Sequence, residues 1–423
     1  MEYAVLGGGA LGLTIALRLA QQGEKVTVYE KEQDPGGLAS GFRVDGVWLE
    51  KFYHHIFRSD RAIVRMIKEL GLEEKLLWPR PKTVIFWEDD FHQLDSPTSL
   101  LKFTPLSIVD RIRLGAVMAY LKVVPSASLE GKKASEWIRR TMGEGPYRVV
   151  WGPMLESKFG PVKEEIAMPW FWARVRDRSS ELGYLRGGFQ QFYNRLAEEI
   201  GAHGGQLRFC STVNDVHSEP DGTLVVSSTV GEHRFDRVVS TLPVQLTCRL
   251  VSELPQNYRE RYSWGKAYGA HCLILSLNRR LTDSYWTNIN DPGYPFMVLV
   301  EHTNYMSPDD YGGRHLIYLG NYRPMDDPLF SRGKEEVLGE FTPHLSRINS
   351  AFTTDWITES WMFAAPFAQP IVTVDYREHI PPFDTPIPGL YVASMFQVYP
   401  HDRGQNYSVE LAERLAEHLH MGT

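Results

Sequence analysis

The sequence predicts an α/β fold with two domains, and two observations carry that prediction. Near the N-terminus, a strand-like run at residues 3–6 leads into a glycine-rich turn, an apolar helix pattern and a second strand at residues 25–29. This order of elements is typical of the first βαβ unit of a parallel sheet. The chain of 423 residues also exceeds the length at which one hydrophobic core keeps growing, so a second domain is expected.

The glycine-rich turn has the spacing of a dinucleotide-binding motif. Gly7, Gly9 and Gly12 occupy the three positions of G-x-G-x-x-G. In that motif the glycines allow, in turn, a tight bend, the close approach of a pyrophosphate, and close packing of helix on strand. The helix that begins with Ala10 and Leu11 directs free N–H groups and partial positive charge toward the phosphates.

An acidic residue and a second glycine pair follow. Glu30 ends the second strand, where a carboxylate accepts hydrogen bonds from a ribose diol. After it come a basic residue, Lys31, and the pair Gly36 and Gly37, which let backbone amides reach a long diphosphate. With these residues the segment resembles the second fingerprint of the flavin-containing amine oxidase superfamily, which includes protoporphyrinogen oxidases and phytoene desaturases. The resemblance implies FAD as the cofactor. Family members often carry Arg after the glycine pair, where this chain has Leu38.

Patches further along the chain resemble later parts of the same family's nucleotide-binding domain. By that resemblance Val213 holds the adenine through its backbone, and Thr241 and Pro243 lie where a strand ends near the cofactor. A final strand at residues 388–394 leads through a loop into a closing helix at about residues 406–419. The FAD-binding domain is therefore expected to be discontinuous.

The resemblance implies a two-domain, FAD-binding Rossmann-like fold of the GR2 type, with an α+β substrate domain. We expect the FAD-binding domain to comprise residues 1–59, 176–255 and 372–423, and the substrate domain to comprise residues 60–175 and 256–371. The sequence contains no second strand–glycine–helix motif, which argues against a reductase with two nucleotide sites.

Periodicity differs between the two parts of the expected substrate domain. Residues 60–175 have mostly helical patterns, whereas residues 256–371 have the patterns of a sheet. Residues 102–124 predict an amphipathic helix. We expect this helix to pack its apolar face in the core, with contact to a membrane or a lipid channel as the alternative. Within the FAD-binding part, residues 234–240 predict one strand.

The C-terminal loop and two adjacent histidines are the catalytic candidates. The closing helix begins near Asn406 and Tyr407; its N-terminus, aimed at the N1–C2=O edge of the flavin, would stabilise the anion formed on reduction. Arg403 would reinforce that anion or hold an anionic substrate, unless it is an ordinary surface cation. His54 and His55 lie on a segment that passes beside the isoalloxazine in related flavoenzymes. Either one can serve as a proton carrier or as a donor to N5, and a structural role for the pair is an equal alternative.

Polar residues that follow two apolar strands are candidates for substrate contacts. These residues are Glu301, His302, Asn304 and Tyr322. Ordinary loop residues with satisfied hydrogen bonds are the favoured alternative for this group.

Composition excludes several other classes of protein. A net charge of −7 argues against nucleic-acid binding as the main role. Three widely spaced cysteines, Cys210, Cys248 and Cys272, provide neither a disulfide framework nor a zinc site, and no metal is expected. With no signal-peptide pattern and no apolar run long enough to cross a bilayer, we expect a cytoplasmic protein whose membrane contact, if any, is peripheral.

These observations predict an FAD-dependent oxidoreductase in which a small-molecule substrate gives a hydride to flavin N5. Amines, polyisoprenoids and other lipid-like molecules, porphyrin precursors and nucleotide sugars all stay open as substrates. Residues 52–57 also resemble locally a histidine-containing segment of UDP-galactopyranose mutase, so a flavin enzyme without net redox turnover is the alternative. A non-catalytic binding protein of the same fold is a third possibility.

Overall fold

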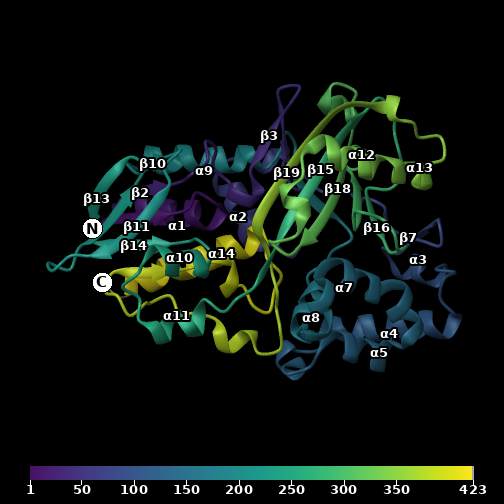
Figure 1. The fold of residues 1–423 in the computed structure, drawn as a ribbon, viewed down its shortest axis with the longest axis horizontal. Coiled ribbons are helices and arrows are strands. Elements are labelled where there is room, and N and C mark those ends of the chain that lie inside the picture. The colour runs from purple at the N-terminus through teal and green to yellow at the C-terminus, as the bar shows by residue number, and fades with distance from the viewer. Residues whose placement is uncertain (422–423) are drawn as a thin grey trace.

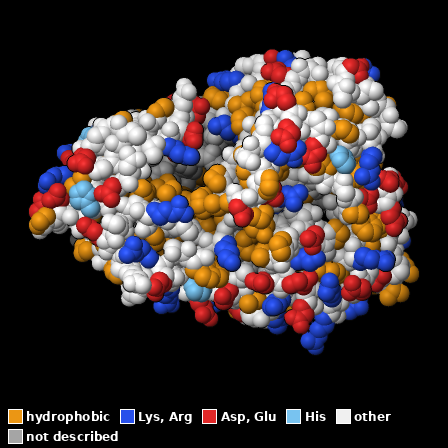
Figure 2. Space-filling model, viewed as in Figure 1, with side chains coloured by type: hydrophobic (Ala, Val, Ile, Leu, Met, Phe, Trp, Pro, Cys, Tyr) orange, Lys and Arg blue, Asp and Glu red, His pale blue; other side chains and the backbone are white. Residues whose placement is uncertain are grey.

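The computed structural model describes residues 1–421. It contains a five-stranded sheet toward one end of the molecule and a seven-stranded sheet toward the other, with a group of helices beneath the larger sheet (Figure 1). The N-terminus and the end of α14 (Gln405–Met421) lie beside the five-stranded sheet (Figure 1). Figure 2 shows this face hollowed between the two parts. The predicted α/β class is confirmed.

The five-stranded sheet is parallel throughout. Its order is β10 (Gln206–Arg208), β2 (Lys25–Tyr29), β1 (Glu2–Leu6), β14 (Arg237–Ser240) and β20 (Leu390–Val392). Adjacent strands run in the same direction at every pairing. The carboxyl ends of all these strands therefore meet at one edge, where ligands bind in open parallel sheets.

Helices cover this sheet. The helix α1 (Ala10–Gln21) packs against α9 (Gln190–Ala202) and α14 (Gln405–Met421), and α14 also packs against α2 (Arg61–Glu69). The sequence of α1 explains its central place, because Leu13, Ala16, Leu17 and Ala20 recur at helical spacing and are all buried.

The strand predicted at residues 234–240 is wrong as one element. The chain forms β13 (Gly231–Phe235) and then β14, in different sheets. β13 completes an antiparallel sheet with β11 (Val213–Ser218) and β12 (Leu224–Ser228). The change falls at Asp236, whose N–H donates to the carbonyl of Glu2 over 2.9 Å and whose carboxylate accepts from the N–H of Glu2 over 2.7 Å. Only Asp236 and Arg237 separate Phe235 from Val238, and with neither glycine nor proline there the sequence carried no turn signal at this break.

The seven-stranded sheet is mixed. In order, its strands are β19 (Ile357–Pro370), β15 (Ala267–Leu277), β18 (His315–Arg323), β17 (Val298–Glu301), β16 (Trp286–Ile289), β7 (Thr83–Trp87) and β8 (Asp90–Gln93). β19 contains Pro366 in its interior, which is tolerated because β19 is an edge strand and Pro has no N–H to donate. Residues from both halves of the expected substrate domain thus share one sheet, while its boundaries stay a prediction.

Shorter elements complete the fold. They are β3 (Gly41–Val44), β4 (Val47–Glu50), β5 (Ile56–Phe57), β6 (Leu76–Leu77), β9 (Leu182–Leu185), α10 (Val244–Leu250), α11 (Gln256–Tyr262), α12 (Lys334–Phe341) and α13 (Leu345–Ile348). The group beneath the large sheet includes α3 (Pro97–Leu101), α4 (Ile108–Val123), α5 (Ala134–Met142), α7 (Gly152–Phe159) and α8 (Met168–Arg176) (Figure 1).

The helix expected at residues 102–124 is present as α4, but much of its apolar face is exposed instead of packed in the core. α4 packs against α3, α5 and α8, yet only Leu114 and Leu121 on it are buried. Several of its apolar side chains are instead exposed, namely Ile108, Val109, Ile112 and Val123. The apolar stripe of α4 is therefore wider than the face that its neighbours cover. Across residues 1–421 no helix is long and apolar enough to cross a membrane.

Candidate functional site

The two glycine segments predicted to bind a dinucleotide lie side by side. The N–H of Gly36 donates to the carbonyl of Gly8 over 2.8 Å, and Gly9 forms a parallel bridge with Gly36. A side chain on Gly37 would lie 3.2 Å from the Cα of Gly9, so this approach requires glycine. A side chain on Gly9, by contrast, would meet no protein atom within 4 Å. The protein thus leaves open the space in front of Gly9 that a pyrophosphate needs.

The base of this turn is tightly packed. A side chain on Gly12 would lie 1.9 Å from the carbonyl oxygen of Gly7, whose φ of 106° also favours glycine. Thr241, at the end of β14, donates through Oγ1 to the carbonyl of Leu6 over 2.8 Å. Pro243 follows as the residue before α10. These contacts hold the carboxyl ends of β1 and β14 together beneath the turn.

Glu30 is buried at the end of β2, where its carboxylate orders the backbone on both sides. It accepts hydrogen bonds from the N–H of Gly8 over 2.6 Å and from the N–H of Glu32 over 2.9 Å. Its own carbonyl accepts from the N–H of Ser211, which brings the chain that leads to Val213 beside it. The carboxylate lone pairs that remain are available to ribose hydroxyls.

Lys31 and Leu38 were also predicted to contact the cofactor. The side chain of Lys31 is exposed and forms an ion pair with Glu32 at 3.4 Å. Leu38 lies within the short helical turn Gly37–Ala39 and is partly exposed.

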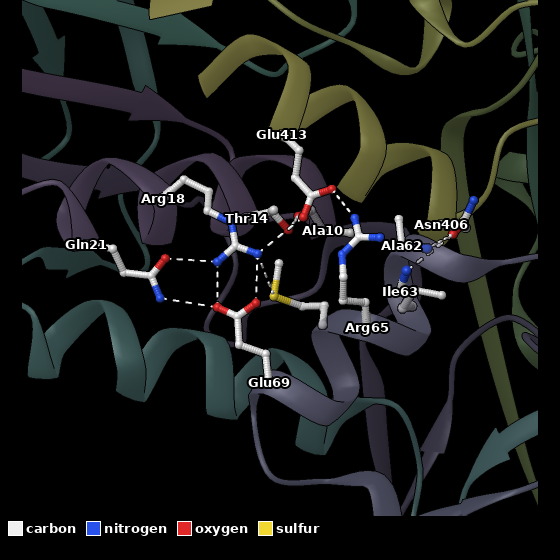
Figure 3. Close-up of polar contacts among 11 residues, drawn as sticks. Ala10, Thr14, Arg18, Gln21, Ala62, Ile63, Arg65, Glu69, Asn406 and Glu413 are labelled. Atoms are coloured by element: carbon white, nitrogen blue, oxygen red, sulfur yellow. Dashed lines mark hydrogen bonds and ion pairs between the residues drawn. The ribbon is translucent and has the colours of Figure 1, made fainter. Parts of the chain in front are cut away.

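The N-terminus of α14 is held in place by side chains that had been predicted to contact the cofactor. Asn406 Oδ1 accepts from the N–H groups of Ala62 and Ile63 at 2.9 and 3.2 Å and so caps α2 (Figure 3). Tyr407 donates its hydroxyl to Asp177 over 2.7 Å. These contacts favour a positioning role for both side chains, which leaves the free backbone N–H groups of the first turn to face a ligand.

Ion pairs fix α14 further along its length. Arg18 on α1 forms a bidentate pair with Glu69 of α2, with the second contact at 2.8 Å, and reaches Glu413 of α14 at 3.2 Å (Figure 3). Arg65 of α2 pairs with the other oxygen of Glu413 at 2.6 Å. The three helices around the turn are thereby joined, so the sheet edge and the start of α14 keep a fixed relation.

Two buried polar atoms show that the protein alone does not satisfy this region. The Oγ of Ser394, just after β20, and the Nε2 of Gln405, at the start of α14, have no hydrogen-bond partner among residues 1–421. Buried polar groups are rarely left unpaired, so each calls for a further partner. Together with the open space at Gly9, these atoms fit a long, polar group bound along the sheet edge.

The predicted histidines have different neighbours. His54 Nδ1 lies 2.6 Å from the carbonyl of Phe52, whereas His55 Nδ1 lies 3.2 Å from the hydroxyl of Tyr285 and its ring packs edge-on against Trp286. Burial lowers the pKa of His54 to about 4 and that of His55 to about 3. Both rings are therefore neutral at pH 7.

Arg403 joins the C-terminal loop to the large sheet. Its guanidinium donates to Gln369 of β19 and to the hydroxyl of Tyr322, at the end of β18. It also lies close enough to His54 to contribute to the lowered pKa of that ring. The alternative of an ordinary surface cation does not fit these contacts, since only 22% of the side chain is exposed.

Three other residues predicted to contact substrate, Glu301, His302 and Asn304, form hydrogen bonds within the protein. Glu301 is fully buried, and its two oxygens accept from the N–H groups of Leu281 and Thr282 at 2.9 and 2.6 Å. His302 Nε2 lies 2.8 Å from the hydroxyl of Tyr311, and Asn304 donates to two backbone carbonyls. These contacts favour structural roles for the three residues, whereas Tyr322 remains at the site.

A group of cations beside Arg403 was not predicted. Lys158 of α7 and Arg174 of α8 approach the carboxylate of Asp402 at 3.5 and 3.3 Å, and Arg403 lies 3.8 Å from it. Arg178 follows α8 and lies near Arg174. The sequence does place arginines at every second position from 174 to 178, but Asp402, with which Arg174 pairs, lies more than two hundred residues away.

The family model described as "Flavin containing amine oxidoreductase" matches residues 12–401. The chain belongs to this family. Family membership makes FAD the cofactor, and it confirms the resemblance seen in the sequence. Among residues 1–421 no group of metal-binding side chains is found.

Curated relatives in this family are distant. A 15-cis-phytoene desaturase of Narcissus pseudonarcissus is 24% identical over 62% of this chain and 50% of its own length. A coproporphyrinogen III oxidase of Staphylococcus aureus is 20% identical over 58% of this chain and 61% of its own length. The matches therefore span about half to three-fifths of these relatives.

Solved structures share the whole fold. A protein of Exiguobacterium sp. 255-15, named provisionally as a protoporphyrinogen oxidase, superimposes with a TM-score of 0.79 at 17% identity over 100% of this chain and 99% of that one. Reduced UDP-galactopyranose mutase superimposes with a TM-score of 0.78 at 14% identity over 100% of this chain and 96% of that one. At such identities the likeness establishes the fold alone.

Proposed function

We propose that this protein is an FAD-dependent oxidoreductase in which a small-molecule substrate gives a hydride to flavin N5. The observation that carries the proposal is the convergence at one sheet edge of the open glycine turn, the buried Glu30 and the N-terminus of α14. Bound FAD supplies the redox chemistry, accepting a hydride and passing electrons to oxygen or another acceptor. The domain boundaries and the cytoplasmic location given above remain predictions.

The residues of this chain contribute binding, orientation and proton handling. The backbone around Gly9 and Gly36 holds the diphosphate, and Glu30 accepts from the ribose. The first-turn N–H groups of α14 and the charge of Arg403 favour an anionic partner beside them. His54 is neutral at pH 7 and lies near enough to Arg403 for its charge to lower the pKa of the ring, so the free imidazole nitrogen can accept a proton from the substrate.

Anaerobic mixing of the purified holoenzyme with candidate substrates tests the proposal. Amines, polyisoprenoids, porphyrin precursors and nucleotide sugars are each added while the visible absorption of the flavin is followed. We expect one class to bleach the flavin and an added acceptor to restore its colour. Isomerisation of a substrate only by pre-reduced enzyme, with no net consumption of electrons, would overturn the proposal in favour of mutase chemistry. A purified protein that binds no FAD would overturn it altogether.

A further inference from the structure

We propose that Lys158, Arg174, Arg178 and Arg403 form a binding site for an oxyanion of the substrate, a phosphoryl or carboxylate group. The inference rests on the proposed function, since it names the chemical class of the molecule that reaches the flavin. It assigns to these four cations the task of holding one end of the substrate.

The charges in this cluster do not balance within the protein. Three of the cations, Lys158, Arg174 and Arg403, have one ion-pairing carboxylate between them among residues 1–421, namely Asp402. The nearby Asp177 is engaged by His401 and by the hydroxyl of Tyr407, each at 2.7 Å. Burial lowers the pKa of Lys158 well below its usual value, but Arg174, Arg178 and Arg403 alone carry more positive charge than Asp402 balances. Buried cations are normally paired, so this excess calls for an anion from outside.

Individual donors in the cluster also lack acceptors. The Nε of Arg174 is buried without a partner, and no acceptor for the guanidinium of Arg178 is found within residues 1–421. Arg178 is accessible to solvent, yet burial and the neighbouring Arg174 lower its pKa. Its guanidinium can therefore be reached by a ligand, and we call the space beside these four cations the recess. The planar guanidinium presents several N–H groups that suit bidentate binding of a phosphate or carboxylate.

The recess adjoins both the catalytic candidates and an opening. Arg174 and Arg178 lie near enough to His55 to contribute to its lowered pKa, as Arg403 does for His54. On the other side, the ring of Tyr322 lies 4.9 Å from Lys158 Nζ and lines a cavity of about 330 Å³ at the ends of α7 and β18. An anion held by the cluster would therefore place the rest of a substrate between the cavity and the histidines.

The charge of the cluster selects among substrate classes. An amine that is protonated at pH 7 would be repelled by the excess positive charge, and an uncharged hydrocarbon would leave the donors unpaired. A molecule with a phosphoryl or carboxylate end would neutralise the excess and supply the missing acceptors. We therefore expect acidic substrates rather than amines, although the chain belongs to an amine oxidoreductase family.

Titration of the holoenzyme with inorganic pyrophosphate and, separately, with succinate tests the site at constant ionic strength. Bound FAD fills the dinucleotide site, so the probe reports on the recess through the flavin absorption spectrum. We expect saturable perturbation by at least one probe. Pyrophosphate alone would identify a phosphoryl end, and succinate alone a carboxylate end. In Arg178→Gln the dissociation constant should rise about tenfold to a hundredfold, as for the loss of a charge-assisted hydrogen bond.

Two further variants separate binding from folding. Arg176→Gln removes an exposed cation two residues before Arg178, at the end of α8, whose guanidinium donates to the carbonyl of Lys122, and should leave the dissociation constant unchanged. Arg178→Lys should restore part of the affinity. Because Arg178 has no ion-pair partner to lose, Arg178→Gln should retain its FAD and its Tm.

Absence of saturable binding by both probes, or equal losses in Arg176→Gln and Arg178→Gln, would overturn the site. Flavin bleaching by a cationic substrate without anion binding would overturn the site alone, whereas anion binding without any bleaching would challenge the redox proposal alone.

Discussion

The two glycine segments proposed to hold FAD, which we call the cradle, and the recess around Asp402 present different chemical groups to a ligand. The cradle consists mainly of backbone from two short segments within the first 37 residues, held together by hydrogen bonds such as that from Gly36 to Gly8. The recess consists of charged side chains from α7, α8 and the C-terminal loop. Backbone amides suit a cofactor common to a whole family, whereas side chains can change with the substrate. The determinants of substrate specificity should therefore be sought among the side chains of the recess, not in the glycine segments.

The largest effect is expected at Gly9, where the cradle should fail without loss of the fold. Gly9→Val places its side chain in space that holds no protein atom, so the variant should fold but bind no FAD. Flavin content and the Tm of the apoprotein measure the two properties separately. Gly12→Val is the matched control, because its side chain meets the carbonyl of Gly7 and should prevent folding. Normal flavin content in Gly9→Val would show that the backbone around Gly9 does not bind the pyrophosphate of FAD.

A large effect is also expected at one of the two histidines. His54→Ala should lower the rate of flavin reduction by about 10²–10⁴, the usual range for general acid–base assistance, while His55→Ala should lower it little. The reason is that the ring of His55 is engaged by the hydroxyl of Tyr285 and packs edge-on against Trp286, whereas the only side-chain hydrogen bond found for His54 among residues 1–421 is to the carbonyl of Phe52. Stopped-flow reduction at several pH values checks this. Because the pKa of His54 is lowered to about 4, the rate should not titrate near pH 6.5. Equal, minor losses in both variants would show the pair to be structural.

The stability of the fold around a buried carboxylate that belongs to neither region should depend on pH. Glu50, at the end of β4, accepts from the hydroxyl of Tyr184 and the N–H of Phe189, and burial raises its pKa from 4.5 to about 7. The ionised form is thus disfavoured in the folded state, and its cost grows as pH rises through this window. Glu50→Gln should therefore stabilise the protein above pH 7 by up to about 3 kcal/mol, with no gain below the unfolded-state pKa. Denaturant unfolding at the two pH extremes measures the difference, and a gain that is the same at both would contradict it.

The smallest effect is expected at Glu30, where side chain and backbone cooperate. Glu30→Ala should weaken FAD binding by about 1–3 kcal/mol through loss of a charge-assisted hydrogen bond to the ribose. Titration of the apoprotein with FAD measures the change. Glu30→Gln keeps an acceptor for the N–H of Gly8 and should lose less. Equal losses in the two variants would show that the hydrogen bond to Gly8 contributes nothing, and unchanged affinity in Glu30→Ala would contradict the contact with the ribose.

The sequence by itself determined the nucleotide-binding turn, the family and the α/β class. This was possible because the turn is local: its strands, glycines and acid follow one another within about thirty residues, and the backbone conformation they require depends on residue type. The apolar spacing of α1 likewise needed no distant partner, since every position of its buried face lies in one helix.

Only the tertiary structure decided which side chains the turn and the catalytic candidates meet. It assigned Asn406 to the cap of α2 and Glu301 to a buried backbone turn, and it divided residues 234–240 between two sheets. It also brought Lys158 and Arg174 to Asp402 across more than two hundred residues. The physical reason is that a side chain's partner is set by the packing of distant elements, and a single sequence carries no periodic signal for such a pairing.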